Sequence, residues 1–199
     1  MGVGITAPKL NILLIGNSHA DSIKNEFMKV ARNNGSNVHF IISNNPLMKR
    51  GLSPESIIND AIKKNIDVIV LHYNNRPLPF LQKIIKLNEL AGENNIKITL
   101  IEPVPHWPVD IPEAMYLGEE PNQNKFDYLN KNNLELYGYK SIASDNFRIV
   151  PVVGVFCSAG CQFQSAEGKP LYFDSNHLTL TGASILNGTF EDVIRFYLP

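Results

Sequence analysis

Short apolar runs alternate along the chain with longer stretches in which apolar residues recur at helical spacing. The runs are bounded by polar residues or glycine, which is typical of buried strands. The expected strands are residues 11–15, 38–42, 67–71, 97–101 and 148–153. The longer stretches predict amphipathic helices, because apolar residues three or four positions apart share one helix face. The expected helices are residues 20–32, 53–64, 78–94, 125–136 and 181–197.

This alternation predicts an α/β fold for residues 11–199. Parallel strands need long crossover connections, and a helix between successive strands supplies each of them. We therefore expect a three-layer, doubly wound and mainly parallel five-stranded sheet. Residues 1–10 lack the charged and apolar regions of a signal peptide, and we expect them to be a leader or linker segment. Residues 102–124 are rich in proline and predict a long loop, which in a compact domain often carries function.

The composition is that of an ordinary globular domain. The chain has 199 residues, of which 44% are hydrophobic and 19% charged, and its formal net charge is −1. This length suits one α/β domain with a full core. The sequence has no basic run that would hold phosphates, so we expect no nucleic-acid partner. It also has no apolar stretch near the roughly 20 residues that a membrane span needs.

Two cysteines, Cys157 and Cys161, lie close together and bear on the compartment. The residues between them include Gly160, and glycine allows the tight turn of a small disulfide loop. A metal site would need more thiols or histidines at ligand spacing. The spacing therefore favours a disulfide, with free thiols as the second interpretation and a metal site as the third. A disulfide would place the domain outside the reducing cytosol.

The first candidate for chemistry is the segment Gly16-Asn17-Ser18-His19-Ala20 after the first expected strand. Active sites of doubly wound sheets lie at the carboxyl ends of the strands. A serine at such a strand-to-helix turn is exposed, and the helix that follows can offer N–H groups to a developing oxyanion. Two other interpretations remain open for these residues: Ser18 as a helix N-cap, or a flavodoxin-like loop that holds a phosphate.

The second candidate is Asp174 and His177, which lie three positions apart just before the last expected helix. A nucleophilic serine needs a base to take its proton, and the base needs a carboxylate to orient it. Together with Ser18, the pair predicts a Ser-His-Asp triad. The α/β-hydrolase fold is a rival, since its G-x-S-x-G elbow is half matched here. That elbow follows a later strand, and its acid and histidine are usually far apart in sequence.

The two blocks together resemble those of the SGNH (GDSL-like) hydrolase superfamily. The resemblance is closest to the SGNH domain fused to the membrane acyltransferase-3 domain of bacterial polysaccharide O-acetyltransferases. That subgroup typically reads G-D-S-H-A near its start and C-x(n)-C, G-x-P-L-Y and D-x-x-H-L-[ST]-x-x-G-A near its end. The matching residues here are 16–20, Cys157, Cys161, 168–172, 174–179, Gly182 and Ala183, with a similar proline-rich middle at 103–112. One departure is Asn17, where aspartate is usual, and we expect it to change the loop geometry only modestly.

The resemblance implies roles for individual residues. Ser18 would be the nucleophile, His177 the general base and Asp174 the orienting acid, with no metal or cofactor. The family's oxyanion donors are the nucleophile's own N–H, a glycine after the second strand and an asparagine after the third. These carry over to Ser18, Gly51 and Asn74, with Asn75 as the alternative register. The remaining candidates for substrate contact are His19, beside the nucleophile, and the pair His106-Trp107 in the proline-rich segment. That pair would equally suit a local hydrophobic anchor.

The resemblance also implies a function and a setting. We expect an acyl donor and a glycan acceptor, with O-acetylation of a cell-envelope glycan such as lipopolysaccharide O-antigen. The implied partner is an N-terminal membrane acyltransferase-3 domain that tethers this domain to the inner membrane on its periplasmic or extracytoplasmic side. Two alternatives stay open: a free-standing SGNH carbohydrate esterase that uses the same triad, and an inactive glycan-binding module that keeps the fold.

Overall fold

A five-stranded parallel sheet forms the centre of the computed structural model, which describes residues 7–43, 46–48, 50–74, 81–121, 138–158 and 160–198. The strand order is β2-β1-β3-β4-β5, and every neighbouring pair is parallel. The strands are β1 (Asn11–Gly16), β2 (Asn37–Ile42), β3 (Val68–His72), β4 (Lys97–Ile101) and β5 (Phe147–Val150). The doubly wound parallel sheet predicted from the alternating pattern is therefore confirmed.

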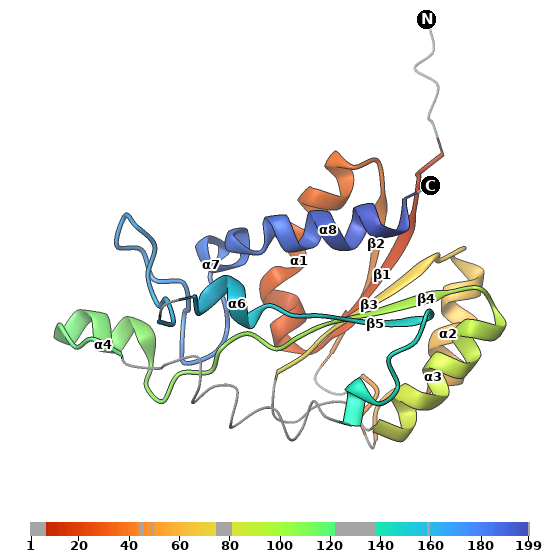
Figure 1. Ribbon diagram of the computed structural model, residues 1–199, viewed down its shortest axis with the longest axis horizontal. Coiled ribbons are helices and arrows are strands. Elements are labelled where there is room, and N and C mark those ends of the chain that lie inside the picture. Colours follow the sequence, from red (N-terminus) through yellow and green to blue (C-terminus); the bar gives the residue numbers. More distant parts are fainter. Residues whose placement is uncertain are drawn as a thin grey trace, which may run out of the picture.

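Helices cover both faces of the sheet (Figure 1). One face carries α1 (Ser18–Asn33), α7 (Leu180–Ile185) and α8 (Asn187–Tyr197), and the other carries α2 (Pro54–Lys63) and α3 (Leu81–Glu93). Alternate residues of each strand point into the two cores: in β1, Ile12 and Leu14 join the α1 side while Leu13 and Ile15 join the α2 side. Burial on both faces explains why the central strands β1, β3 and β4 read as continuous apolar runs.

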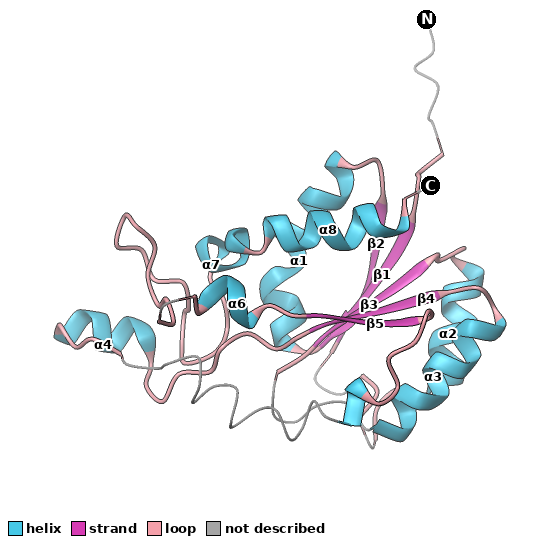
Figure 2. Ribbon diagram, viewed as in Figure 1, coloured by secondary structure: helices cyan, strands magenta, loops and turns pink. Residues whose placement is uncertain are grey.

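The proline-rich segment contains a helix where we predicted only a loop. Helix α4 (Ile111–Leu117) begins at Asp110, whose side chain accepts a hydrogen bond from the Glu113 backbone N–H at 3.2 Å. Pro112 lies in the first turn, where the absence of its N–H costs no helical hydrogen bond. Gly118 ends the helix in the left-handed conformation, with a φ of 71°. The prolines were therefore wrongly taken to exclude a helix (Figure 2).

Two other boundaries near the C-terminus differ from the prediction. The strand expected to reach residue 153 ends at Val150, and the chain continues into the short helix α6 (Val153–Phe156). The single closing helix is instead two helices, α7 and α8, separated at Leu186. Leu186 is buried in the core, so the apolar periodicity continues through the break and gives no sign of it. The helix expected at residues 125–136 lies outside the described residues.

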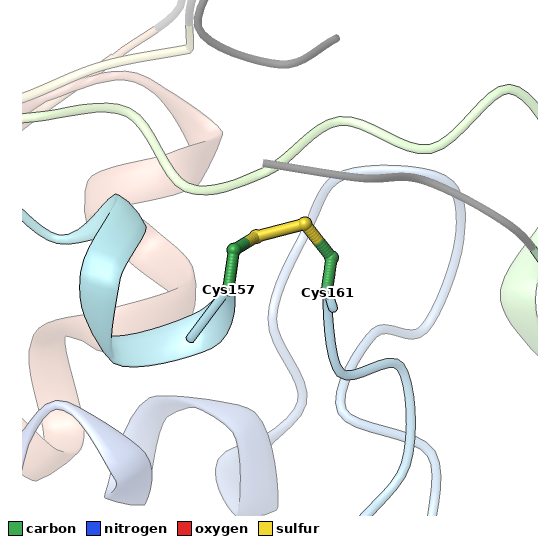
Figure 3. The surroundings of a disulfide bond; sticks show 2 residues. All are labelled: Cys157 and Cys161. Atoms are coloured by element: carbon green, nitrogen blue, oxygen red, sulfur yellow. A yellow bond between two sulfur atoms is a disulfide. The ribbon is translucent and has the colours of Figure 1, made fainter. Parts of the chain in front are cut away.

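The disulfide between Cys157 and Cys161 is present, as the spacing predicted (Figure 3). It closes a short turn directly after α6, and the Gln162 N–H donates to the Phe156 carbonyl across it at 2.9 Å. Residues 9 and 10, which we assigned to a leader or linker, pack on the domain: Leu10 is in the core and the Lys9 N–H donates to Gly35 O at 2.9 Å. Within the described ranges, no helix combines the length and the apolarity needed to cross a membrane.

Candidate active site

Ser18 lies where the carboxyl end of β1 meets the first turn of α1. The N-cap of α1 is Asn17, whose side-chain oxygen accepts the His19 backbone N–H at 3.1 Å. The interpretation of Ser18 as the N-cap is therefore wrong, and Asn17 performs the capping that an aspartate would also perform. The Ser18 hydroxyl is exposed instead, and its Oγ lies 2.6 Å from His177 Nε2.

Gly16 fixes the place at which the chain leaves the sheet. A Cβ at this position would lie 2.0 Å from the His72 carbonyl oxygen and 2.4 Å from the Ala20 Cβ. Both distances are far shorter than non-bonded contacts allow, so only glycine lets β1 run this close to β3 and α1. The approach determines where the next residues emerge, and it thereby positions the Ser18 hydroxyl above the carboxyl edge of the sheet.

Asp174 and His177 form the second half of the site. The Asp174 Oδ2 lies 2.6 Å from His177 Nδ1, and Oδ1 accepts the backbone N–H groups of Asn176 and His177 at 2.7 Å each. Partial burial alone would raise the pKa of Asp174, but these backbone and imidazole hydrogen bonds lower it below its ordinary value. In the neutral imidazole tautomer that donates its Nδ1–H to this carboxylate, Nε2 can accept the Ser18 O–H.

The proline-rich segment holds this loop in place. The Trp107 backbone N–H donates to the Ser175 carbonyl at 2.8 Å, and the Ile111 N–H donates to the Asp174 carbonyl at 3.4 Å. The Trp107 side chain is only 1% exposed and packs edge-on against Phe163 and Tyr172. Of the two interpretations given above for Trp107, substrate contact or local hydrophobic anchor, its burial supports the anchor. His106, directly before it, is exposed.

A buried histidine lies beside the His177 imidazole. The His19 ring is 2% exposed, and its centroid lies 4.4 Å from that of His177. Burial, followed by the neighbouring His72 and His177, lowers the pKa of His19 to about 2, so its ring is neutral. Burial likewise lowers the pKa of His72 to about 4, although a contact of 3.3 Å between its Nδ1 and the Ile101 carbonyl opposes this. His19 therefore supports His177 from the core side instead of facing a substrate.

The expected oxyanion donors differ in how the structure places them. Asn74 follows β3 at the same carboxyl edge of the sheet as Ser18 and is half-buried. The Gly51 N–H donates to the Met48 carbonyl at 2.9 Å and so closes a local turn. Its N–H is therefore occupied within that turn. Asn75, the alternative register, lies outside the described residues.

Phe173 is a residue of this site that the sequence reasoning missed. Its ring is 57% exposed and stacks on the His177 imidazole, with centroids 5.2 Å apart and planes inclined by 17°. The preceding residues Leu171 and Tyr172 are fully buried, so the chain turns this third large apolar side chain outward. The available signal was a large aromatic residue directly next to a triad residue, in a loop whose core positions were already filled.

Comparison with known proteins gives one family match and one similar fold. A family model described as the SGNH domain fused to AT3 domains matches residues 3–192. Among solved structures, the salicylyl-acyltransferase SsfX3 from a tetracycline biosynthetic pathway is similar with a TM-score of 0.57 and 15% identity, over 98% of this chain and 57% of that one. The chain thus spans little more than half of that enzyme, and at this identity the likeness shows a shared fold.

A second structure is more distantly similar. It is the N-terminal part of the protein BF1531 from Bacteroides fragilis, which contains a phosphatase domain complexed with Mg, with a TM-score of 0.44 and 16% identity over 94% of this chain and 52% of that one. A search of curated protein sequences found no match.

Proposed function

The chain belongs to the family of SGNH domains that are fused to AT3 domains, and we propose that it transfers an acyl group through a covalent intermediate on Ser18. Membership supports an SGNH-type enzyme that transfers acyl groups or hydrolyses esters. The observation that carries the finer proposal is the continuous hydrogen-bonded chain from Ser18 Oγ through His177 to Asp174, with both contacts at 2.6 Å. Nucleophile, base and orienting acid are thus within reach of one another.

In the first step, the Ser18 Oγ attacks the carbonyl carbon of an acyl donor. His177 Nε2 takes the serine proton, and the Asp174 carboxylate stabilises the resulting imidazolium. The tetrahedral intermediate collapses when the bond to the leaving group breaks, and the leaving group takes the proton from Nε2. The acyl group is then bound to Ser18 as an ester.

Charge that develops on the carbonyl oxygen needs hydrogen-bond donors. As the first residue of α1, Ser18 contributes one of the N–H groups that have no carbonyl partner inside a helix. The positive end of the α1 dipole acts in the same place. The Asn74 side-chain amide is the second donor that we propose. Each well-placed donor of this kind stabilises the transition state by about 3 kcal/mol.

In the second step, an acceptor hydroxyl attacks the acyl-serine. His177 Nε2 takes the hydroxyl proton, the ester bond to Ser18 breaks, and the proton returns to the serine oxygen. We propose that the acceptor is a cell-envelope glycan such as lipopolysaccharide O-antigen, and that an AT3 membrane domain supplies the acyl group. The family's fusion to AT3 domains and the disulfide, which persists only in an oxidising compartment, both support a membrane-tethered extracytoplasmic setting.

The test is turnover of p-nitrophenyl acetate by the wild type, Ser18→Ala and the control Ser22→Ala, with and without a de-O-acetylated glycan. Ser22 lies one turn further along the same helix. We expect Ser18-dependent release that the glycan accelerates, with acylated glycan as the product. Equal, negligible release by the wild type and Ser18→Ala would contradict the triad and favour an inactive glycan-binding module.

A carbohydrate esterase is the second candidate function, because the Ser18 hydroxyl is exposed and water can reach it. The chemistry is the same, with water as the acceptor. Ser18-dependent release that the glycan does not accelerate, with free acetate as the sole product, would favour this candidate over the transferase.

A further inference from the structure

An exposed aromatic ring lies on the solvent side of the triad. Phe173 stacks on His177 with a centroid distance of 5.2 Å, and the buried His19 lies tilted against it at 4.4 Å. Their exposures differ widely, at 57% for Phe173 and 2% for His19. The catalytic imidazole therefore has a buried ring supporting it and an exposed ring beside its open side.

Exposure of a single large apolar side chain is common and has no meaning by itself. Phe173 is distinguished by how firmly its backbone is held next to the reacting atoms. Its N–H donates to the His177 carbonyl at 3.0 Å, and the neighbouring Tyr172 pairs with Leu178 in an isolated bridge. The ring is also nearly parallel to the imidazole, at 17°. The orientation of the Phe173 ring is thus fixed, with its centroid 5.2 Å from that of the His177 imidazole.

We propose that Phe173 is a platform for a sugar ring of the acceptor glycan, one unit away from the sugar whose hydroxyl attacks the acyl-serine. This inference rests on the proposed function and specifies its substrate class as a chain of at least two sugars. The C–H groups on one face of a pyranose pack on an aromatic face, while its hydroxyls remain free to bind polar groups or water. Burying the exposed ring adds the usual hydrophobic contribution.

The geometry separates the platform from the reacting hydroxyl. The attacking hydroxyl must reach His177 Nε2, which already lies 2.6 Å from Ser18 Oγ. Phe173 instead contacts the plane of the imidazole. A sugar that covers Phe173 is therefore offset from Nε2, and a neighbouring unit of the same chain presents the hydroxyl. Asp174 follows Phe173 in the sequence, and its carboxylate is ionised. Charge repulsion therefore disfavours binding of an anionic acyl donor on Phe173, whereas a neutral sugar is not repelled.

The test compares Phe173→Ala, Phe173→Trp and the control Phe196→Ala. Phe196 is also exposed, at 62%, and lies on α8 beside Tyr197. Transfer is measured to a de-O-acetylated O-antigen oligosaccharide and to its component monosaccharides, with p-nitrophenyl acetate hydrolysis as the readout of the triad alone. We expect Phe173→Ala to raise the KM for the oligosaccharide about fivefold more than it raises the KM for the monosaccharides or for p-nitrophenyl acetate. Phe173→Trp should restore the KM, and Phe196→Ala should behave as the wild type.

A second measurement separates failure of the platform from failure of the proposed function. Binding of the same oligosaccharide is measured calorimetrically to Ser18→Ala and to Ser18→Ala/Phe173→Ala, neither of which needs to turn over. Weaker binding by the double variant supports the platform even if the wild type transfers nothing. Equal binding by both, or binding by neither, overturns it. An equal loss of p-nitrophenyl acetate hydrolysis and of transfer in Phe173→Ala would also overturn it, since Phe173 would then only position His177.

Discussion

The two halves of the triad are built in different ways. The nucleophile turn, residues 16–20, joins a strand paired on both sides to a helix that starts at once. The base loop, residues 171–179, contains no helix or strand and is held by isolated bridges and by backbone hydrogen bonds from the proline-rich segment. Regular structure thus fixes the serine, while contacts between distant segments fix the histidine and the aspartate.

This difference predicts which property each half controls. Changes in the nucleophile turn disturb the packing of β1, β3 and α1, so they should lower stability first. Changes to polar side chains of the base loop leave the cores intact, so they should lower activity first. The following predictions test this division, beginning with the largest effect.

Asp174→Asn should lower turnover by about 10³-fold or more with little change in stability. The amide can still accept the backbone N–H groups but no longer holds the imidazole in its working tautomer. Turnover of p-nitrophenyl acetate and urea unfolding are measured together. Asp110→Asn is the matched control, since asparagine also caps the start of α4. Turnover of Asp174→Asn within tenfold of the wild type would contradict the assigned role.

Gly16→Ala should destabilise the fold by about 3 kcal/mol, because the added Cβ overlaps the His72 carbonyl. Gly154→Ala provides the comparison: it lies in α6, and a Cβ there meets no heavy atom within 4 Å. That control should be as stable as the wild type or slightly more so. Equal stabilities of the two variants, measured by urea unfolding, would show that β1 is not held as closely as described.

Removing the disulfide should cost about 2 kcal/mol, since it closes only a short loop. Cys157→Ser/Cys161→Ser is unfolded in urea beside the wild type, with and without reductant. Reductant should lower the stability of the wild type alone. If it affects the double variant equally, the effect does not arise from this bond.

The smallest effect is expected in the pH dependence of stability. Burial lowers the pKa of His72 to about 4 from its ordinary 6.5. As the pH falls below 6.5, the unfolded chain binds a proton that the folded chain does not, so folding weakens progressively down to about pH 4. Between pH 7 and 5.5 this amounts to about 1 kcal/mol. His72→Gln should show a smaller loss over that interval, while His19 contributes in the same direction in both proteins. An equal loss in both would contradict the prediction.

The sheet was predictable because its signal is local. The three central strands, β1, β3 and β4, are buried on both faces, so their apolar runs are continuous and need no knowledge of their neighbours. The boundaries that failed depended on context. A proline disrupts a helix interior, but Pro112 is compatible with the first turn of α4, and the periodicity from α7 to α8 persists across the break at Leu186.

The site shows the same division. Ser18, Asp174 and His177, whose side chains the structure brings together, could be proposed because the first lies in one short block and the other two in a second. The burial of His19, the turn that occupies the Gly51 N–H and the outward Phe173 ring all arise from contacts between segments far apart in sequence or from local backbone turns. Apart from the aromatic residue next to Asp174, pattern and spacing along the chain contain no signal for these features, so they needed the structure.

The central claim is that Ser18 forms the acyl-enzyme, and mass spectrometry of rapidly acid-quenched mixtures with p-nitrophenyl acetate tests it most directly. The wild type should gain the mass of one acetyl group, located by peptide mapping on the peptide that contains Ser18. Ser18→Ala should gain none. An acetyl group on Ser18→Ala at the same level, or one located on another peptide of the wild type while the Ser18 peptide stays unmodified, would contradict the account.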